Sequence, residues 1–372
     1  MSGSELPVTT LVAMAGFLAG IIFGATANRT NFCTMGAISD VVFIGDYRRM
    51  RAWMLSIAVA IVGTQGLHSA GIIDIYTSIY LRPDLSWLGN IIGGLLFGFG
   101  MTLSGGCGNK TLVRIGTGNL KSIVVFLIMG LVAYMTLRGI TSFLRINLSQ
   151  MTNINLLEMG FSTQGISDMT ATGMSIEQDT ARWPVVALIA GGLAIYCFKD
   201  KSFRGSQVHV WSGIIVGAIV VSGWWITGVL GFDDFDPAPL TSFTFVAPSG
   251  ESIQYLMIFT GTTINFGIAA VGGVIAGSFL MAIFTKTFNI ETFADANDLL
   301  RNMSGAVLMG FGGVMAMGCT IGQGITGMST LAVGSLISLI AIIGGGVFGM
   351  KYLEEGNFID AFKTIFSIGS DE

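Results

Sequence analysis

The chain has 372 residues, of which 52% are hydrophobic and only 11% are charged, whereas an ordinary soluble domain carries about 25% charged residues. This composition excludes a soluble protein of this length, because so few charged side chains cannot cover its surface. The net charge of −4 excludes the basic face that nucleic-acid binding needs, and four cysteines are too few for a disulfide scaffold. Lipid is therefore the predicted surroundings of most of the chain.

Nine apolar stretches without an internal charge follow one another along the sequence, and membrane helices need about 20 such residues. The predicted spans are 8–27, 52–71, 87–106, 122–137, 183–198, 211–230, 264–285, 302–318 and 330–350. Several are short, and short or glycine-interrupted spans are typical of broken helices in transporters. The sequence thus predicts an all-α integral membrane protein with about nine transmembrane helices and short broken half-helices.

The basic residues predict the orientation of these spans. With the N-terminus outside, the inner loops hold 14 Lys and Arg residues and the outer loops hold 4. Lys and Arg accumulate on the cytoplasmic side of membrane proteins. We therefore expect a multi-pass protein of the bacterial inner membrane, with a periplasmic N-terminus and a cytoplasmic C-terminus.

A long connection, 138–182, divides the chain. It is rich in Ser, Thr, Asn and Asp, has little apolar periodicity, and lies outside in the predicted topology. We expect three parts, namely a first membrane repeat (1–137), a periplasmic linker (138–182) and a second membrane repeat (183–372).

An internal repeat carries cysteines in register. GFGMTLSGGC ends at Cys107 and GFGGVMAMGC ends at Cys319, each nine residues after its first glycine. A weaker copy places Gly24 nine residues before Cys33, and a fourth, GAIVVSGWWITG, has Ile226 at the cysteine position. In the predicted topology the copies of the two halves run in opposite directions. That arrangement is an inverted repeat, which places a site near the middle of the bilayer.

Glycines after these spans permit tight turns, and a short helix that starts there presents free N–H groups to an anion. In lipid, such irregular backbone is tolerated where it is buried or lines a water-filled path. The sequence therefore predicts an anion path lined by half-helix N-termini. Its candidate residues are Cys33, Cys107, Cys319, Gly105, Gly106, Gly108, Gly318, Thr320, Gln323 and Asn31.

A thiol is a soft, polarizable group and a weak donor, which favours a substrate with an exposed sulfur or selenium over a hard oxyanion. The thiols should stay protonated in an apolar setting, since a thiolate would repel an anion. The bland alternative for any of these cysteines is a small core residue, and Cys197 is assigned that role. A disulfide between two of them is a further alternative that the sequence does not resolve.

Two absences shape the functional prediction. The sequence has no Walker A loop, so we expect no ATP hydrolysis by this chain. None of the predicted spans contains Asp or Glu, although proton-coupled carriers usually have ionisable groups in the membrane. A facilitated path, or one driven by consumption of substrate inside, is expected, with no cofactor and no metal.

The elements NFCTMGAISD, GFGMTLSGGC, GFGGVMAMGCTIGQG and TSFTFVAP resemble the YeeE/YedE family of bacterial sulfur-compound transporters. The resemblance implies an inverted-repeat helical fold with nine spans and import of thiosulfate. It also implies that Cys33, Cys107 and Cys319 pass the ion along by S–H···S hydrogen bonds. A small cytoplasmic sulfur-carrier protein is the implied partner.

The leading functional prediction is thus a thiosulfate permease and not an enzyme. The alternatives are a transporter of another sulfur or selenium compound and a membrane thiol enzyme for sulfur transfer. An enzyme needs an activated thiolate, and no His lies near the three motif cysteines in the sequence.

Overall fold

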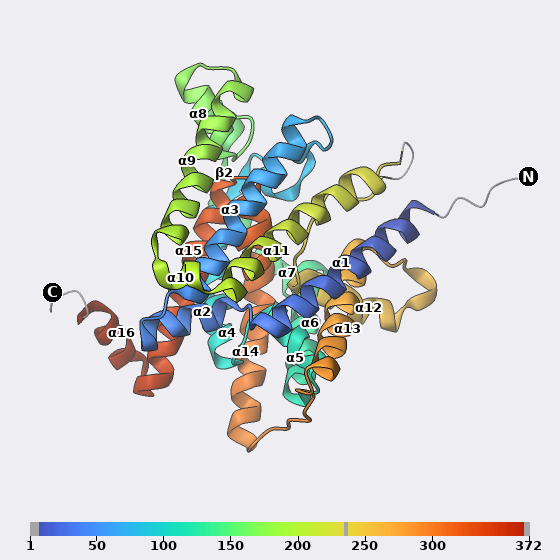
Figure 1. Ribbon diagram of the computed structural model, residues 1–372, viewed down its shortest axis with the longest axis vertical. Helices are drawn as coiled ribbons and strands as arrows, with labels where there is room; N and C mark the ends of the chain where they lie inside the picture. The colour runs from blue at the N-terminus through green and yellow to red at the C-terminus, as the bar shows by residue number, and fades with distance from the viewer. Residues whose placement is uncertain (1–6, 234–236, 368–372) are drawn as a thin grey trace, which may run out of the picture.

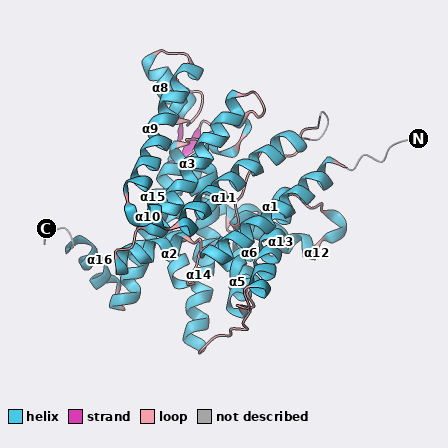
Figure 2. Cartoon of the chain, in the orientation of Figure 1, coloured by secondary structure: helices cyan, strands magenta, loops and turns pink. Residues whose placement is uncertain are grey.

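The computed structural model describes residues 7–233 and 237–367, and Figures 1 and 2 show that this part of the chain is almost entirely helical. Each predicted span coincides with a helix. These helices are α1 (Val8–Thr30), α3 (Arg48–Ser69), α4 (Trp87–Leu103), α6 (Leu120–Arg138), α9 (Gln178–Lys199), α11 (Gln207–Trp225), α13 (Phe266–Phe284), α14 (Ala296–Met315) and α15 (Val333–Glu355).

Shorter elements join the long helices. The α-helical ones are α2 (Thr34–Ser39), α5 (Gly108–Gly116), α7 (Ser142–Thr152), α8 (Ile166–Met174), α10 (Lys201–Gly205), α12 (Val246–Met257) and α16 (Phe358–Ser367). Three segments are π-helical, namely η1 (Asp40–Ile44), η5 (Ile226–Leu230) and η7 (Gly322–Gly327). Four are 3₁₀-helical, namely η2 (Ile75–Thr77), η3 (Ile79–Leu81), η4 (Leu156–Met159) and η6 (Phe259–Gly261). The two strands are β1 (Asp84–Ser86) and β2 (Asn153–Asn155).

Eight helical segments of the described residues are long and apolar enough to cross a membrane. The predicted span that is not among them corresponds to α14, whose first two turns carry the charged residues Asp298 and Arg301. This helix nevertheless packs against both α4 and α6. The chain is therefore a multi-pass, all-α membrane protein, and the count of nine crossings stays a prediction.

Helices from the two predicted halves pack against one another. Helix α1 lies along α13 and α3 lies along α11, while α4 lies along α15 and α6 along α14. Figure 1 shows the blue α1 beside the orange α13. If α1, α3, α4 and α6 correspond in turn to α11, α13, α14 and α15, every one of these contacts has its reciprocal. Two interlocked repeats would produce this pattern, and the inverted repeat itself stays a prediction.

Glycines bring these helices into close contact. At the α1–α13 interface, a Cβ added at Gly24 would lie 2.1 Å from the carbonyl oxygen of Val274. A Cβ added at Gly277 would lie 2.1 Å from the carbonyl oxygen of Ile21. The hydrophobic effect does not drive apolar helices together in a bilayer, because lipid tails are as apolar as the side chains. Close packing of the backbones therefore has to stabilise such an interface. This requirement explains why the chain contains so many glycines.

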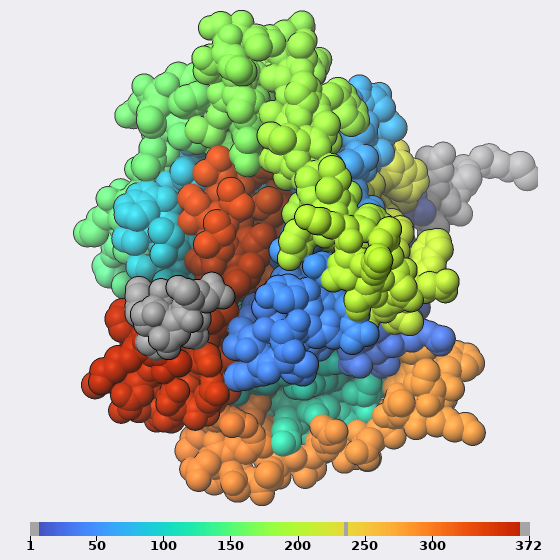
Figure 3. Space-filling view, turned by 60° about the vertical axis from the view of Figure 1, so that its left-hand side comes forward, coloured from blue at the N-terminus to red at the C-terminus, as the bar shows by residue number. Residues whose placement is uncertain are grey.

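The linker is folded and joins the ends of helices that are distant in the sequence. Strand β2 pairs antiparallel with β1, and the amide of Ile166 donates to the carbonyl of Leu331 at 2.9 Å. The Gln164 carbonyl accepts from the Val333 amide at 2.9 Å, and its side-chain oxygen accepts from the Gly334 amide at 3.1 Å. Figure 3 shows the green α8 and α9 at the top of the molecule, above the red α15. The linker thus ties the start of α15 to the first half.

A topology experiment checks the predicted orientation. A reporter fused after Lys363 should be cytoplasmic, and one inserted within 150–175 should be periplasmic, because 14 of the 18 basic residues fall on the predicted inner side. Paired reporters that are active only in one compartment measure this directly. If both positions report the same compartment, the predicted topology is wrong.

Candidate transport site

The three cysteine motifs form the same helix break. In each, the residue two positions before the cysteine has a left-handed backbone conformation, which ends the preceding helix. These residues are Asn31 (φ 51°), Gly105 (φ 66°) and Met317 (φ 55°). Glycine and asparagine adopt this conformation readily, whereas methionine does so rarely. The break after α14 therefore keeps an unfavourable residue at its turn.

The backbone hydrogen bonds of the three breaks also agree. The residue just before each cysteine donates its N–H to the carbonyl five residues earlier, which is the 6→1 bond of a Schellman motif. These bonds run from Phe32 to Ala27 (3.2 Å), from Gly106 to Met101 (2.9 Å) and from Gly318 to Gly313 (2.8 Å). The repeat in the sequence is therefore one local structure that occurs three times.

Each cysteine then begins a new helical segment. Cys33 and Cys107 are the N-cap residues of α2 and α5, both with extended backbone, and the Cys319 carbonyl accepts from the Gln323 amide at 2.8 Å. The Cys319 sulfur accepts from the Gly322 amide at 3.4 Å. The corresponding amides, those of Gly36 and Lys110, interact with the sulfurs of Cys33 and Cys107. All three sulfurs thus lie at helix N-termini, where the backbone favours negative charge.

Two of the thiols are in contact although 74 residues separate them. Cys33 Sγ lies 3.8 Å from Cys107 Sγ, far beyond the roughly 2.05 Å of a disulfide bond, and both residues are free cysteines. Cys107 donates to Asn109 Oδ1 at 2.6 Å, and Asn109 Nδ2 donates to the Phe32 carbonyl at 3.4 Å. The asparagine therefore connects the two breaks and holds the thiols side by side.

Thr320 lies between this pair and the third cysteine, to which it is adjacent in the chain. Its hydroxyl is buried near the Cys107 thiol and makes no hydrogen bond. Its neighbour Cys319 lies 3.9 Å from the Thr244 hydroxyl. Cys107 and Cys319 are both 0% exposed. We call these polar residues, Thr244, Cys319, Thr320, Cys107 and Cys33, the series, and all but the half-buried Thr244 are buried.

The other predicted site residues lie around this series. Gln323 is buried, donates its side-chain amide to the Ala316 carbonyl and leaves its Oε1 without a partner. Gly108 is the first residue of α5, and a Cβ added there would be 3.7 Å from Phe245 Cβ. Phe245 packs with Phe23 at 5.3 Å between ring centroids. Apolar side chains, some of them aromatic, therefore surround the series.

A cavity of about 510 Å³ reaches the series from the predicted cytoplasmic side. Cys33, Asn31 and Gly105 are among its lining residues. Asn31 Oδ1 accepts from Lys110 Nζ at 2.9 Å, so the lysine lies at the cavity and does not extend freely to the membrane surface. We call this space the inner cavity.

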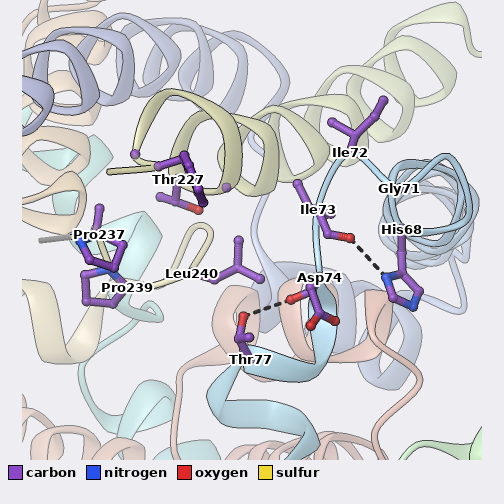
Figure 4. Close-up of a pocket in the computed structure, with 14 residues that line it drawn as sticks. His68, Gly71, Ile72, Ile73, Asp74, Thr77, Thr227, Pro237, Pro239 and Leu240 are labelled. Carbon is purple, nitrogen blue, oxygen red and sulfur yellow. Dashed lines mark hydrogen bonds between the residues drawn. The ribbon is translucent and has the colours of Figure 1, made fainter. Parts of the chain in front are cut away.

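A second cavity, of about 640 Å³, lies on the predicted outer side and holds none of the three motif cysteines. Figure 4 shows that Ile73, Thr227 and Leu240 come from separate elements around it. Thr227 Oγ1 donates to the Thr241 carbonyl at 2.6 Å and so anchors the segment that carries Thr244. That segment therefore joins the wall of the outer cavity to the cysteine series.

One sequence interpretation is wrong. Ile226, at the cysteine position of the proposed fourth copy, lies in the helix that continues from α11 into η5, and it begins no half-helix. In the second half the chain starts a new helix at α12, after Phe245. The nine-residue register failed here because the π-helical turn carries α11 past the position where the other copies end.

Sequence reasoning missed two residues of the series, Asn109 and Thr244. The Asn109 side chain directly follows GCG, and this polar position at a helix start was the available signal. Thr244 lies in TSFTFVAP, which carries part of the family resemblance, but nothing in that segment pairs it with Cys319, which it reaches through the tertiary fold. Cys197, by contrast, packs with Phe203 in a separate hydrophobic cluster, as expected of a core residue.

Comparisons with known proteins agree with the geometry. A family model described as "Sulphur transport" matches residues 29–348. The chain is 26% identical over 332 residues to the thiosulfate transporter TsuA of Escherichia coli (strain K12), covering 84% of this chain and 86% of that protein. It is 26% identical over 325 residues to TsuA of Spirochaeta thermophila, covering 85% and 92% of the two chains.

A shorter match, 31% identical over 105 residues, joins the chain to the probable transporter YedE of Escherichia coli (strain K12) and covers 28% of this chain and 24% of that protein. The family model itself spans all three cysteine breaks. This multi-pass helical chain therefore belongs to the sulphur-transport (YeeE/YedE) family, whose members are transporters and not enzymes.

Proposed function

We propose that this protein is an inner-membrane permease that imports thiosulfate through the buried series of cysteines. The observation that carries the proposal is the direct approach of Cys33 and Cys107, with 3.8 Å between their sulfurs. The two relatives that match most of the chain are thiosulfate transporters by name.

The chemistry of the series suits a sulfur-bearing dianion. The helix N-termini at the three breaks offer N–H groups and a positive potential to negative charge. Each thiol is neutral and donates a weak S–H···S hydrogen bond to the terminal sulfur of the ion. The ion accepts such a bond from one thiol after another. Because each contact is weak, the ion is not trapped at any position, and passage requires both entry and exit to be easy.

We propose that the ion moves inward, from Thr244 and Cys319 to Cys33, which lines the inner cavity. The predicted spans contain no Asp or Glu, so we propose downhill movement, maintained by consumption of the ion inside. A small cytoplasmic sulfur-carrier protein is the proposed consumer.

The experiment that tests the function uses the purified protein in sealed vesicles. Intact thiosulfate should accumulate inside, down its gradient, without ATP, because the thiols in this mechanism are never consumed. Thiosulfate labelled on its outer sulfur, followed by ion chromatography of the vesicle contents, measures both uptake and chemical identity. Protein-free vesicles are the control. Recovery of sulfite or of a protein persulfide would contradict the permease and indicate a thiol enzyme.

A further inference from the structure

The charged residues that line the inner cavity are all positive. Four of its lining residues, Arg29, Arg49, Lys110 and Arg114, are Lys or Arg, and none of its lining residues is Asp or Glu. In a cleft with low-dielectric walls, charges of one sign focus the field and concentrate ions of the opposite sign.

Most of these cations have no counter-ion among the residues that the structure describes. Among the described residues only Arg49 has one, at 3.0 Å from Asp40. No ion pair is found for Arg29, Lys110 or Arg114 in the described part of the chain, and Lys110 bonds only the neutral Asn31. Uncompensated positive charge at a cavity has an energetic cost that a bound anion would remove.

Two of the cations lie one helical turn apart at the cavity. Lys110 and Arg114 are at positions i and i+4 of α5, where like charges destabilise a helix. A Cβ added at Gly105 would lie 3.4 Å from Arg114 Nη1, so the guanidinium turns back toward the break. Both side chains are only partly exposed. Basic residues that merely fix topology would extend into water, whereas these two converge near Cys33.

We propose that the inner cavity is a binding site for a small divalent anion with sulfate-like oxygens, held by Lys110 and Arg114 beside Cys33. That this is the last binding site before the ion is released rests on the proposed function. Anion binding itself does not, because Lys110 and Arg114 require only a negative charge and oxygen acceptors in the ligand. Sulfate and thiosulfate share this chemistry. Sulfate serves as the probe, since it lacks the terminal sulfur that the thiol series selects.

The Cys33 thiol reports on this site because it lines the cavity, whereas Cys107 behind it is 0% exposed. The full-length protein, purified with Cys197→Ala, is treated with a sulfonate-bearing or an ammonium-bearing methanethiosulfonate, and mass spectrometry locates the modification. The anionic reagent should modify Cys33 at least about ten-fold faster than the cationic one. Sodium sulfate should slow the anionic reagent more than sodium chloride at equal ionic strength does.

Variants assign the effect to the two cations. Lys110→Gln and Arg114→Gln should each lower the rate ratio, and the double variant should bring it near one. Lys110→Arg, which keeps the charge, should preserve the ratio and so exclude misfolding as the cause. Lys199→Gln with Lys201→Gln, which removes two exposed cytoplasmic charges outside the cavity, is the matched control.

Equal rates for the two reagents, no modification of Cys33 by either, or no protection by sulfate would each overturn the anion site. An equal fall of the ratio in the Lys199 and Lys201 control would do the same, since it would show a general surface effect. Loss of thiosulfate uptake in vesicles with the charge preference intact would instead contradict the proposed function and leave this site standing.

Discussion

Replacing Cys107 or Cys319 by alanine should reduce thiosulfate uptake by about ten- to a hundred-fold while leaving membrane abundance near normal. A hydrogen bond to a charged group contributes about 1.5–3 kcal/mol, and each 1.36 kcal/mol on a barrier is ten-fold in rate. Cys107 also contacts both Cys33 and Asn109, so its thiol holds the paired part of the series together. Uptake of labelled thiosulfate by cells that have no other importer measures the loss.

Two further variants distinguish transport by the thiols from core packing and from thiol catalysis. Cys197→Ala should be nearly silent, because that thiol packs in a separate cluster and donates only to the Arg51 carbonyl at 3.2 Å. Cys107→Ser keeps a donor for Asn109 and should retain part of the uptake, whereas a catalytic thiol would lose all function on that change. Equal uptake by the Cys107, Cys319 and Cys197 alanine variants would show that all three cysteines are core residues without a role in transport.

Replacing Gly24 by leucine should prevent the protein from folding in the membrane. A Cβ at this position already lies 2.1 Å from the Val274 carbonyl oxygen, and the backbone of α13 cannot rotate away as a side chain would. Overpacking a filled interior costs typically about 1–3 kcal/mol, and contact with backbone places this change at the upper end. Fluorescence-detected size-exclusion chromatography of the solubilised protein measures the loss of the folded peak.

Gly192→Leu is the matched control for this change. Gly192 also lies in a long apolar helix, α9, but a Cβ added there meets no atom within 4 Å. Its leucine variant should therefore elute as the unaltered protein does. Gly24→Ala should give an intermediate loss, since it adds the clash without the larger side chain. A normal Gly24→Leu profile would show that the α1–α13 interface is looser than its glycines indicate.

Local features of this protein were predictable from the sequence alone. Membrane spans follow from runs of apolar residues, and each predicted span coincides with a helix because lipid forces the backbone to satisfy its hydrogen bonds internally. The three cysteine breaks were also readable, since a Schellman turn is closed by residues within six positions of each other. Gly105 could be found because the left-handed turn before Cys107 favours glycine at that position.

Contacts between distant segments were decided only by the tertiary structure. The approach of Cys33 to Cys107, and that of Thr244 to Cys319, joins segments 74 and 75 residues apart. No periodicity encodes such distances, because they depend on how glycine-lined helices from opposite halves pack. The same packing gathers Lys110 and Arg114 with Arg29 and Arg49 at one cavity, which the spacing of these residues along the chain does not encode. Helix positions are local properties of this chain, and its proposed path is a property of the assembled bundle.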